Sequence, residues 1–140
     1  MYGEVSAPVV VDASVAIEFL DGDPRWRDAF DAWADDDRTL LCPGHFLAEV
    51  ANGQLRGRRV AAADVAARVE RIVASGIEPA DRGLHGLLEA IDLADRHGLT
   101  IYDALYLQLA LDVDGELATL DADLRRAAIA EDLTVTDLRG

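Results

Sequence analysis

The chain contains no lysine: its 13 basic residues are all arginine, set against 27 aspartates and glutamates. A P-loop requires its lysine and a Schiff-base enzyme requires an amine side chain, so the composition excludes both classes. The formal net charge of −14 argues against non-specific binding to nucleic acid, which depends on neutralising phosphates, and it suits a basic protein partner. Two arginine clusters, within residues 56–59 and at 125–126, fit either solvated helix ends or contacts with nucleic acid.

Cysteine and long apolar runs are also scarce. A lone cysteine, Cys42, allows neither an internal disulfide nor a cysteine-based zinc site. No apolar run approaches the roughly 20 residues of a membrane-spanning helix, and residues 1–6 lack the basic and apolar segments of a secretory signal. We therefore expect a cytoplasmic protein with no membrane segment.

Several motifs of common enzyme classes are missing. The sequence has no Gly-x-Gly-x-x-Gly, no Cys-x-x-Cys and no recognisable serine–histidine–acid arrangement. Dinucleotide, redox and acyl-transfer chemistry are therefore disfavoured.

What the chain does contain is a regular alternation of short apolar segments and helical patterns. The 140 residues, 51% of them hydrophobic, are enough for one domain covering residues 1–140. The helix expected at 84–97 should face inward through Leu87, Leu88, Ile91 and the pair at 93–94. Alternating strands and helices predict an α/β fold with a parallel sheet covered by helices. Strands are expected at 8–12, 39–42, 77–79, 116–120 and 133–136. Helices are expected at 14–20, 61–74, 84–97, 103–113 and 122–130, with one more starting at Pro24 and another, which carries Glu49, running from about 43–44 to about 56.

Four acidic residues occupy local settings that suit a site. Asp12 ends the apolar run at 9–11, and Asp121 follows the run at 117–120. Asp103 opens a helix, and Glu49 shares a helix face with apolar neighbours, which is rare for a carboxylate unless it is paired or metal-bound. Parallel sheets place ligands in the crevice beyond the carboxyl ends of their strands. Carboxylates gathered there would repel one another unless a hard divalent cation such as Mg²⁺ were present.

Two of these acids also have a plainer interpretation. Asp12 and Asp103 could each be only a helix N-cap, although Ser14 can take that role and leave Asp12 free. Asp123 is interpreted as a charge in the first turn of its helix. The three histidines show no ligand spacing with one another and are interpreted as structural or surface residues.

The chain resembles PIN-domain ribonucleases, and in particular the VapC toxins of bacterial toxin–antitoxin pairs. Four segments carry the resemblance, in the family's order: Val-Val-Asp-Ala-Ser at 10–14, residues 43–52 with Glu49-Val-Ala-Asn, Leu-Thr-Ile-Tyr-Asp-Ala-Leu-Tyr-Leu at 99–107, and Leu-Ala-Thr-Leu-Asp at 117–121. Gly53 departs from the family pattern, in which a bulkier residue is common.

This resemblance implies a three-layer α/β/α fold and metal-dependent endonucleolytic cleavage of RNA. It implies an acidic site that binds Mg²⁺ or Mn²⁺ and is supported by hydrogen bonds from Ser14, Asn52 and Thr119. A small antitoxin that inhibits the enzyme and a homodimer are further implied. The acidic, metal-binding set is Asp12, Glu49, Asp103 and Asp121.

Two other functions are weighed against this one. The chain could be a catalytically silent PIN module that binds RNA or protein, although it retains all four acids. It could also be a haloacid-dehalogenase-like phosphatase, which likewise begins with a strand and an aspartate. That class needs a second aspartate two positions later, where this chain has Ser14, and it needs a lysine.

Overall fold

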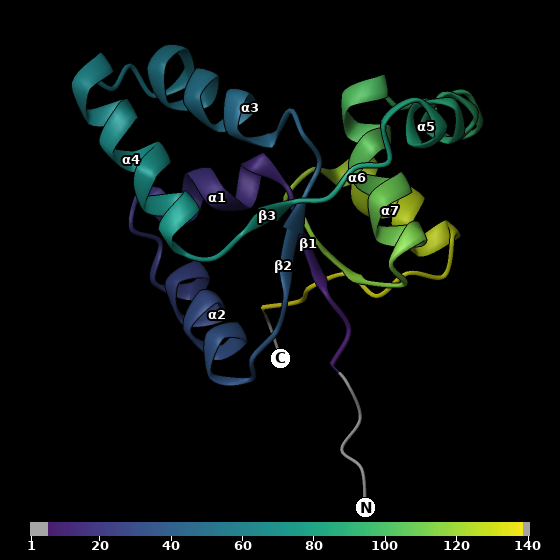
Figure 1. Ribbon diagram of the computed structural model, residues 1–140, viewed down its shortest axis with the longest axis horizontal. Coiled ribbons are helices and arrows are strands. Elements are labelled where there is room, and N and C mark those ends of the chain that lie inside the picture. The colour runs from purple at the N-terminus through teal and green to yellow at the C-terminus, as the bar shows by residue number, and fades with distance from the viewer. Residues whose placement is uncertain (1–5, 139–140) are drawn as a thin grey trace, which may run out of the picture.

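The computed structural model describes residues 6–138. The two ends of the predicted domain lie outside these residues, and so does most of the segment at 1–6 that was considered as a secretory signal. Its centre is a four-stranded sheet in which every pairing is parallel, in the order β3-β2-β1-β4 (Figure 1). The predicted α/β class with a parallel sheet is confirmed. The strands are β1 (Val9–Val11), β2 (Leu40–Cys42), β3 (Glu78–Pro79) and β4 (Glu116–Ala118).

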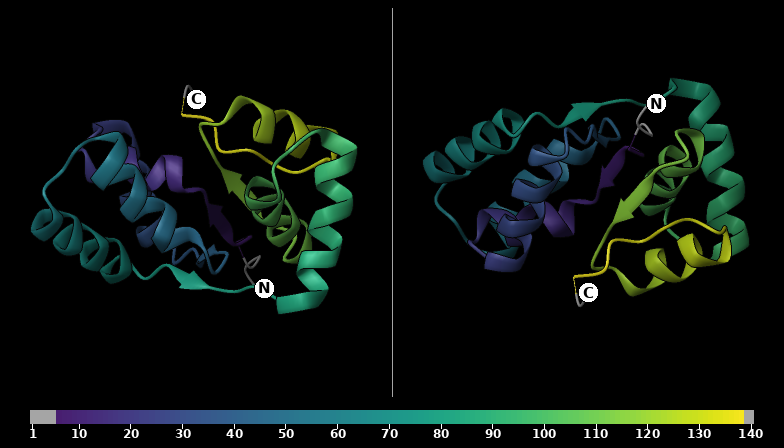
Figure 2. Two further views of the ribbon diagram at one scale, coloured as in Figure 1. Left: turned by 90° about the horizontal axis from the view of Figure 1, so that it is seen from above. Right: turned by 90° about the horizontal axis from the view of Figure 1, so that it is seen from below.

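Helices cover both faces of the sheet, which confirms the three-layer arrangement. Figures 1 and 2 show α1 to α4 on one face and α5 to α7 on the other. A short π-helical segment, η1 (Gly53–Gly57), continues α3. The helices are α1 (Ala13–Leu20), α2 (Pro24–Asp35), α3 (Phe46–Asn52), α4 (Ala62–Ala74), α5 (Gly83–His97), α6 (Ile101–Asp112) and α7 (Ala122–Ala130).

The core forms where these layers meet. All three valines of β1 are fully buried, as expected for a central parallel strand covered on both faces. On α2, Trp26, Phe30 and Trp33 form one buried apolar stripe, as their spacing predicts. Gly53 lies where η1 approaches α1, and a Cβ added there would require the end of the Ile17 side chain to move.

Two predictions about secondary structure are wrong. The strand expected at 133–136 is reduced to an isolated bridge between Leu117 and Val135, because the segment pairs with β4 at that single point. The inward face of α5 is also different from the prediction, since Leu87, Leu88 and Ile91 are exposed. Small residues of α5 pack closely against α6 instead, and the buried positions are Gly86, Ala90, Leu93 and Ala94.

The connections that follow two neighbouring strands, β1 and β4, run to opposite faces of the sheet. After β1 the chain enters α1 on one face, and after β4 it enters α7 on the other (Figure 2). Such a divergence opens a crevice at the carboxyl ends of the two strands. Within residues 6–138, no helix has the length and apolar character needed to span a membrane.

Candidate active site

The four predicted carboxylates line one open pocket of about 420 Å³ at the carboxyl end of the sheet. Asp12 follows β1, Asp121 begins α7 after β4, Glu49 lies on α3 and Asp103 lies on α6. Residues that are up to 109 positions apart in the chain therefore meet at the crevice between β1 and β4.

Asp12 is the most deeply buried of these acids, with 6% of its surface exposed. Its Oδ2 accepts hydrogen bonds from Thr119 Oγ1 at 2.7 Å and from Ser14 Oγ at 2.8 Å. Ser14 Oγ in turn accepts from the backbone N–H of Leu120 at 3.1 Å. The prediction that Ser14 caps α1 is wrong: Asp12 occupies the N-cap position, although its side chain makes no capping hydrogen bond. The Ser14 hydroxyl lies within the helix and donates to Asp12.

Burial and neighbouring charges make ionisation of Asp12 unfavourable. Desolvation raises the pKa of Asp12 above its ordinary value, and the negative charges of Glu49 and Asp103 raise it further. The hydrogen bonds from Thr119 and Ser14 act in the opposite direction but do not cancel the increase. The pocket therefore concentrates negative charge that a bound cation would neutralise.

Asp103 is not the cap of its helix, so the plainer interpretation of this residue is wrong. Helix α6 begins at Ile101, and Thr100 is its N-cap, with Oγ1 accepting from the N–H of Asp103 at 3.1 Å. The pKa of Asp103 is raised by desolvation and then by the negative charge of Asp121. Asp103 is therefore free of a capping role and in electrostatic contact with the rest of the acidic set.

Glu49 has two partners that the sequence analysis did not identify. Its Oε1 accepts a hydrogen bond from Tyr106 Oη at 2.7 Å and lies 3.1 Å from His45 Nε2. Burial acts to raise the pKa of Glu49, but the hydrogen bonds from His45 and Tyr106 outweigh it and the pKa is lowered. His45 precedes Glu49 by four positions and Tyr106 follows Asp103 by three, so helical spacing was the signal that could have identified both.

Thr119 links the two acids that follow strands. Its hydroxyl donates to Asp12 and accepts from the N–H of Asp121 at 3.0 Å. Asp121 is also the N-cap of α7, because its Oδ1 accepts from the N–H of Leu124 at 2.8 Å. Asp121 thus combines a capping role with a place in the acidic pocket. Asp123 forms an exposed ion pair with Arg126, as expected for a helix charge.

Asn52 does not line the acidic pocket. It is exposed on the other side of α3, where it borders a groove between α3 and α4. Among the described residues, no hydrogen bond joins Asn52 to the acidic residues that it was predicted to support. Of the arginine clusters, Arg58 pairs with Glu18 and Asp21 and Arg126 pairs with Asp123, which fits the interpretation as helix-end charges for these two.

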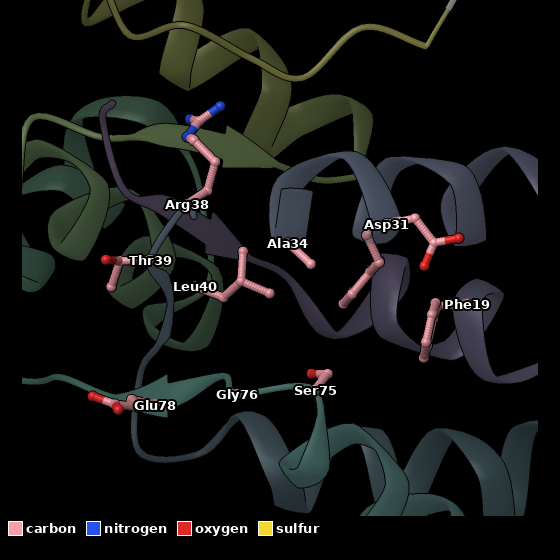
Figure 3. Close-up of a pocket in the computed structure, with 10 residues that line it drawn as sticks. Phe19, Asp31, Ala34, Arg38, Thr39, Leu40, Ser75, Gly76 and Glu78 are labelled. Carbon is pink, nitrogen blue, oxygen red and sulfur yellow. The ribbon is translucent and has the colours of Figure 1, made fainter. Parts of the chain in front are cut away.

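A second hollow, of about 400 Å³, lies away from the acidic pocket, between α2, the start of β2 and the turn before β3 (Figure 3). Phe19 and Leu40 form part of its apolar wall, and Asp31 and Glu78 lie at its edge. Arg38 points away from it and donates to the carbonyl of Ala7 and to Glu116. None of the predicted site residues lines this hollow.

Comparison with known proteins identifies the family. Residues 9–130 match the PIN domain. The chain belongs to the PIN domain family. Over 38 residues, the chain is 50% identical to Ribonuclease VapC3 from Pyrobaculum aerophilum; these residues make up 27% of the chain and 29% of that relative's length. Membership of this family overturns the haloacid-dehalogenase-like alternative.

Solved structures share the fold of this PIN domain. VapBC2 of Rickettsia felis, bound to a DNA fragment from its promoter, superposes with a TM-score of 0.69 at 16% identity, over 91% of this chain and 96% of that one. A toxin–antitoxin complex from Klebsiella pneumoniae gives a TM-score of 0.67 at 18% identity, over 93% and 97%. Mycobacterium tuberculosis VapC20, a Sarcin-Ricin loop cleaving toxin, gives 0.66 at 18%, over 85% and 94%.

The chemistry of the pocket in this PIN domain fits a hard divalent cation. The four predicted ligands are all carboxylates, the donors that Mg²⁺ and Mn²⁺ prefer. As the described side chains lie, no three histidine, cysteine, aspartate or glutamate residues are grouped closely enough to hold an ion together. An open pocket of widely set carboxylates suits an ion that keeps several of its waters. The assignment of the individual ligands remains a prediction.

Proposed function

We propose that this PIN domain is a metal-dependent endoribonuclease and the toxin of a toxin–antitoxin pair. The observation that carries the proposal is the meeting of four carboxylates in one pocket at the point where the chain changes faces of the sheet. Burial and the neighbouring carboxylates raise the pKa of Asp12 and of Asp103, so a bound cation would stabilise their ionised forms. A relative with ribonuclease in its name and neighbouring folds found in toxin–antitoxin complexes support the same function.

In this proposal Asp12 and Asp103 bind Mg²⁺ or Mn²⁺ directly, and Glu49 and Asp121 complete the site. The bound cation would supply activation of water and stabilisation of charge on the scissile phosphate. The protein's own contribution is orientation. Thr119 holds Asp12 and the backbone of Asp121 at fixed positions, and the N-cap bond holds the Asp121 side chain at the start of α7.

Cleavage of RNA by the purified chain tests this function. We expect endonucleolytic products when Mg²⁺ or Mn²⁺ is added and none in the presence of EDTA, measured on denaturing gels. RNA binding without metal-stimulated turnover would contradict the proposal and support the catalytically silent module instead.

The proposed antitoxin has a suitable surface beside the acidic pocket. A groove of about 660 Å³ between α3 and α4 is mainly apolar and includes Leu55, Val65 and Val69. The same helix α3 carries Glu49 toward the acidic pocket, so a partner in the groove would lie next to the site. The net charge of −14 favours a partner with a basic segment that reaches the carboxylates.

Co-purification tests this partner. The protein encoded by the adjacent reading frame should co-purify with the chain and suppress RNA cleavage, and Leu55→Asp should weaken that complex at least about tenfold. Unchanged affinity of Leu55→Asp would exclude the groove as the binding surface.

The proposed homodimer has support in the exposed stripe of α5. Leu84 and Leu88 are 70% and 57% exposed, and Leu87 and Ile91 continue the stripe on successive turns. Four large apolar side chains on one exposed helix face are typical of a protein–protein interface. A second copy presenting the same stripe would bury it by two-fold symmetry.

A charge placed in this stripe should separate the dimer. We expect wild-type protein to have the mass of two chains by light scattering, and Leu88→Glu to weaken association by about tenfold or more because it buries an unpaired charge. Val73→Glu provides the control, since Val73 is 48% exposed on α4 and away from α5. A monomeric wild type, or a Leu88→Glu variant that remains dimeric, would contradict the interface.

A further inference from the structure

Two walls of the acidic pocket are joined by side-chain hydrogen bonds. Glu49 and His45 belong to the start of α3, and Tyr102 and Tyr106 belong to α6. Tyr106 Oη donates to Glu49 Oε1 at 2.7 Å, and His45 Nε2 lies 3.1 Å from Glu49 Oε1 and 3.1 Å from the carbonyl oxygen of Tyr102. The carboxylate on α3 is thereby linked twice to the helix that carries Asp103.

The direction of these hydrogen bonds follows from the atoms involved. A carbonyl oxygen can only accept, and an ionised carboxylate can only accept, so His45 Nε2 must carry a proton to contact both. Tyr106 is fully buried, and because an ionised carboxylate can only accept, its hydroxyl is the donor to Glu49. Ring contacts hold the histidine in place, since its centroid lies 5.1 Å from the Tyr106 ring and 5.6 Å from the Tyr102 ring.

Both bonds end on the same oxygen of Glu49. Among the described residues, Oε1 accepts the hydrogen bond from Tyr106 and makes the 3.1 Å contact with His45 Nε2, whereas Oε2 has neither kind of partner. Asp12 shows the same division, because Thr119 and Ser14 both donate to Oδ2 and leave Oδ1. Each of these two carboxylates therefore uses one oxygen to fix its orientation and has the other available to the pocket that it lines.

We propose that Tyr106 and His45 are positioning residues that hold Glu49 by Oε1 so that Oε2 is presented to the cation. The inference rests on the proposed function, because it assumes that the pocket binds a divalent metal. Neither residue touches the reacting atoms: Tyr106 and His45 act through Glu49. Partners of metal-binding carboxylates commonly contribute ten- to a hundredfold to metal affinity.

Binding of Mn²⁺ alone, without RNA, provides the test. Tyr106→Phe removes only the hydroxyl and keeps the buried ring, and we expect it to weaken Mn²⁺ affinity about tenfold by titration calorimetry. Thr136→Val is the matched control, because it removes another hydroxyl–carboxylate bond, Thr136 Oγ1 to Glu116 Oε2 at 2.5 Å, which lies outside the acidic pocket. The control should bind Mn²⁺ as wild type does, and circular dichroism and thermal melting establish that both variants fold.

The tautomer of His45 gives a second measurement that needs no metal. Nitrogen NMR of the wild-type chain should show the proton on Nε2, and a neutral ring protonated at Nδ1 alone would overturn the role of His45. Wild-type Mn²⁺ affinity in Tyr106→Phe would overturn the role of Tyr106 while leaving the proposed function intact. Absence of Mn²⁺ binding by wild-type protein would overturn the metal site itself, and this inference with it.

Discussion

Replacing Asp12 by asparagine should reduce kcat/KM for RNA cleavage by about a thousandfold or more, because it removes a proposed metal ligand and its charge. Asparagine has nearly the same shape, and its Oδ1 can still accept from Thr119 and Ser14. The local geometry should therefore survive, and the loss should lie in metal binding and chemistry. Cleavage rates with saturating Mn²⁺ would measure it.

The same substitution should stabilise the fold. The pKa of Asp12 is raised in the native state by desolvation and by neighbouring carboxylates, so ionisation of Asp12 costs folding free energy. That cost is absent below the unfolded-state pKa and fully present above the folded-state pKa. Asp12→Asn should therefore raise the free energy of unfolding by about 1 kcal/mol at neutral pH, and the gain should fade as the pH falls through the raised folded-state pKa and be absent below about pH 4. Denaturant unfolding without added metal, across this range, is the measurement.

Asp123→Asn is the control for both effects. Asp123 lies two residues from Asp121 but is exposed and paired with Arg126, so its replacement should change neither RNA cleavage nor stability appreciably. Cleavage by Asp12→Asn at the wild-type rate would refute the metal-dependent mechanism. A loss of activity together with a large loss of stability would instead assign Asp12 a structural role.

Thr119→Val should have the second largest effect, with cleavage reduced about 10- to 100-fold. The hydroxyl of Thr119 is almost fully buried, donates to Asp12 at 2.7 Å and accepts from the N–H of Asp121 at 3.0 Å. Valine keeps the shape but releases both acids from their fixed positions. It also leaves a partly buried N–H without its partner, which should lower the free energy of unfolding by about 1–3 kcal/mol.

The two consequences of Thr119→Val can be separated by comparison with Thr136→Val. Thr136 also donates to a partly buried carboxylate, that of Glu116, but Glu116 does not line the acidic pocket. The control should lose some stability and no activity per folded molecule. If Thr119→Val loses activity only in proportion to its unfolded fraction, the proposed link between Asp12 and Asp121 is not needed for catalysis.

Local pattern was enough to predict most of the fold. A continuous β-branched run at residues 9–11 produces a buried parallel strand, and the spacing of Trp26, Phe30 and Trp33 produces a buried helix face. The predictions failed for two segments whose structure depends on the element that pairs or packs with them. The segment at 133–136 has strand-like residues, but β4 pairs with it at one point only. The apolar stripe of α5 is exposed because small residues such as Ala90 allow a closer approach to α6.

The positions of Asp12, Glu49, Asp103 and Asp121 could be selected from the sequence because each has a local signature, a strand end or a helix face. Their hydrogen-bonding partners were harder to select. The support from Ser14 and Thr119 was implied only by the family resemblance, and His45 was interpreted as a structural or surface residue. Tyr106 has no local signature, since its role depends on Glu49, which belongs to another helix. Asn52 is the opposite case: the family resemblance implied that it supports the site. It lies about one turn beyond Glu49 on α3 and faces the groove between α3 and α4 instead.

The sequence by itself determined the alternation of elements, the parallel sheet and the identity of the acidic residues, because these depend on periodicity and on residues next to one another in the chain. Only the tertiary structure decided which carboxylates line a common pocket and which of their oxygens accept hydrogen bonds from neighbouring side chains. That choice depends on contacts between β1, α3, α6 and the residues that follow β4, which are brought together by burial of the shared core rather than by local preference.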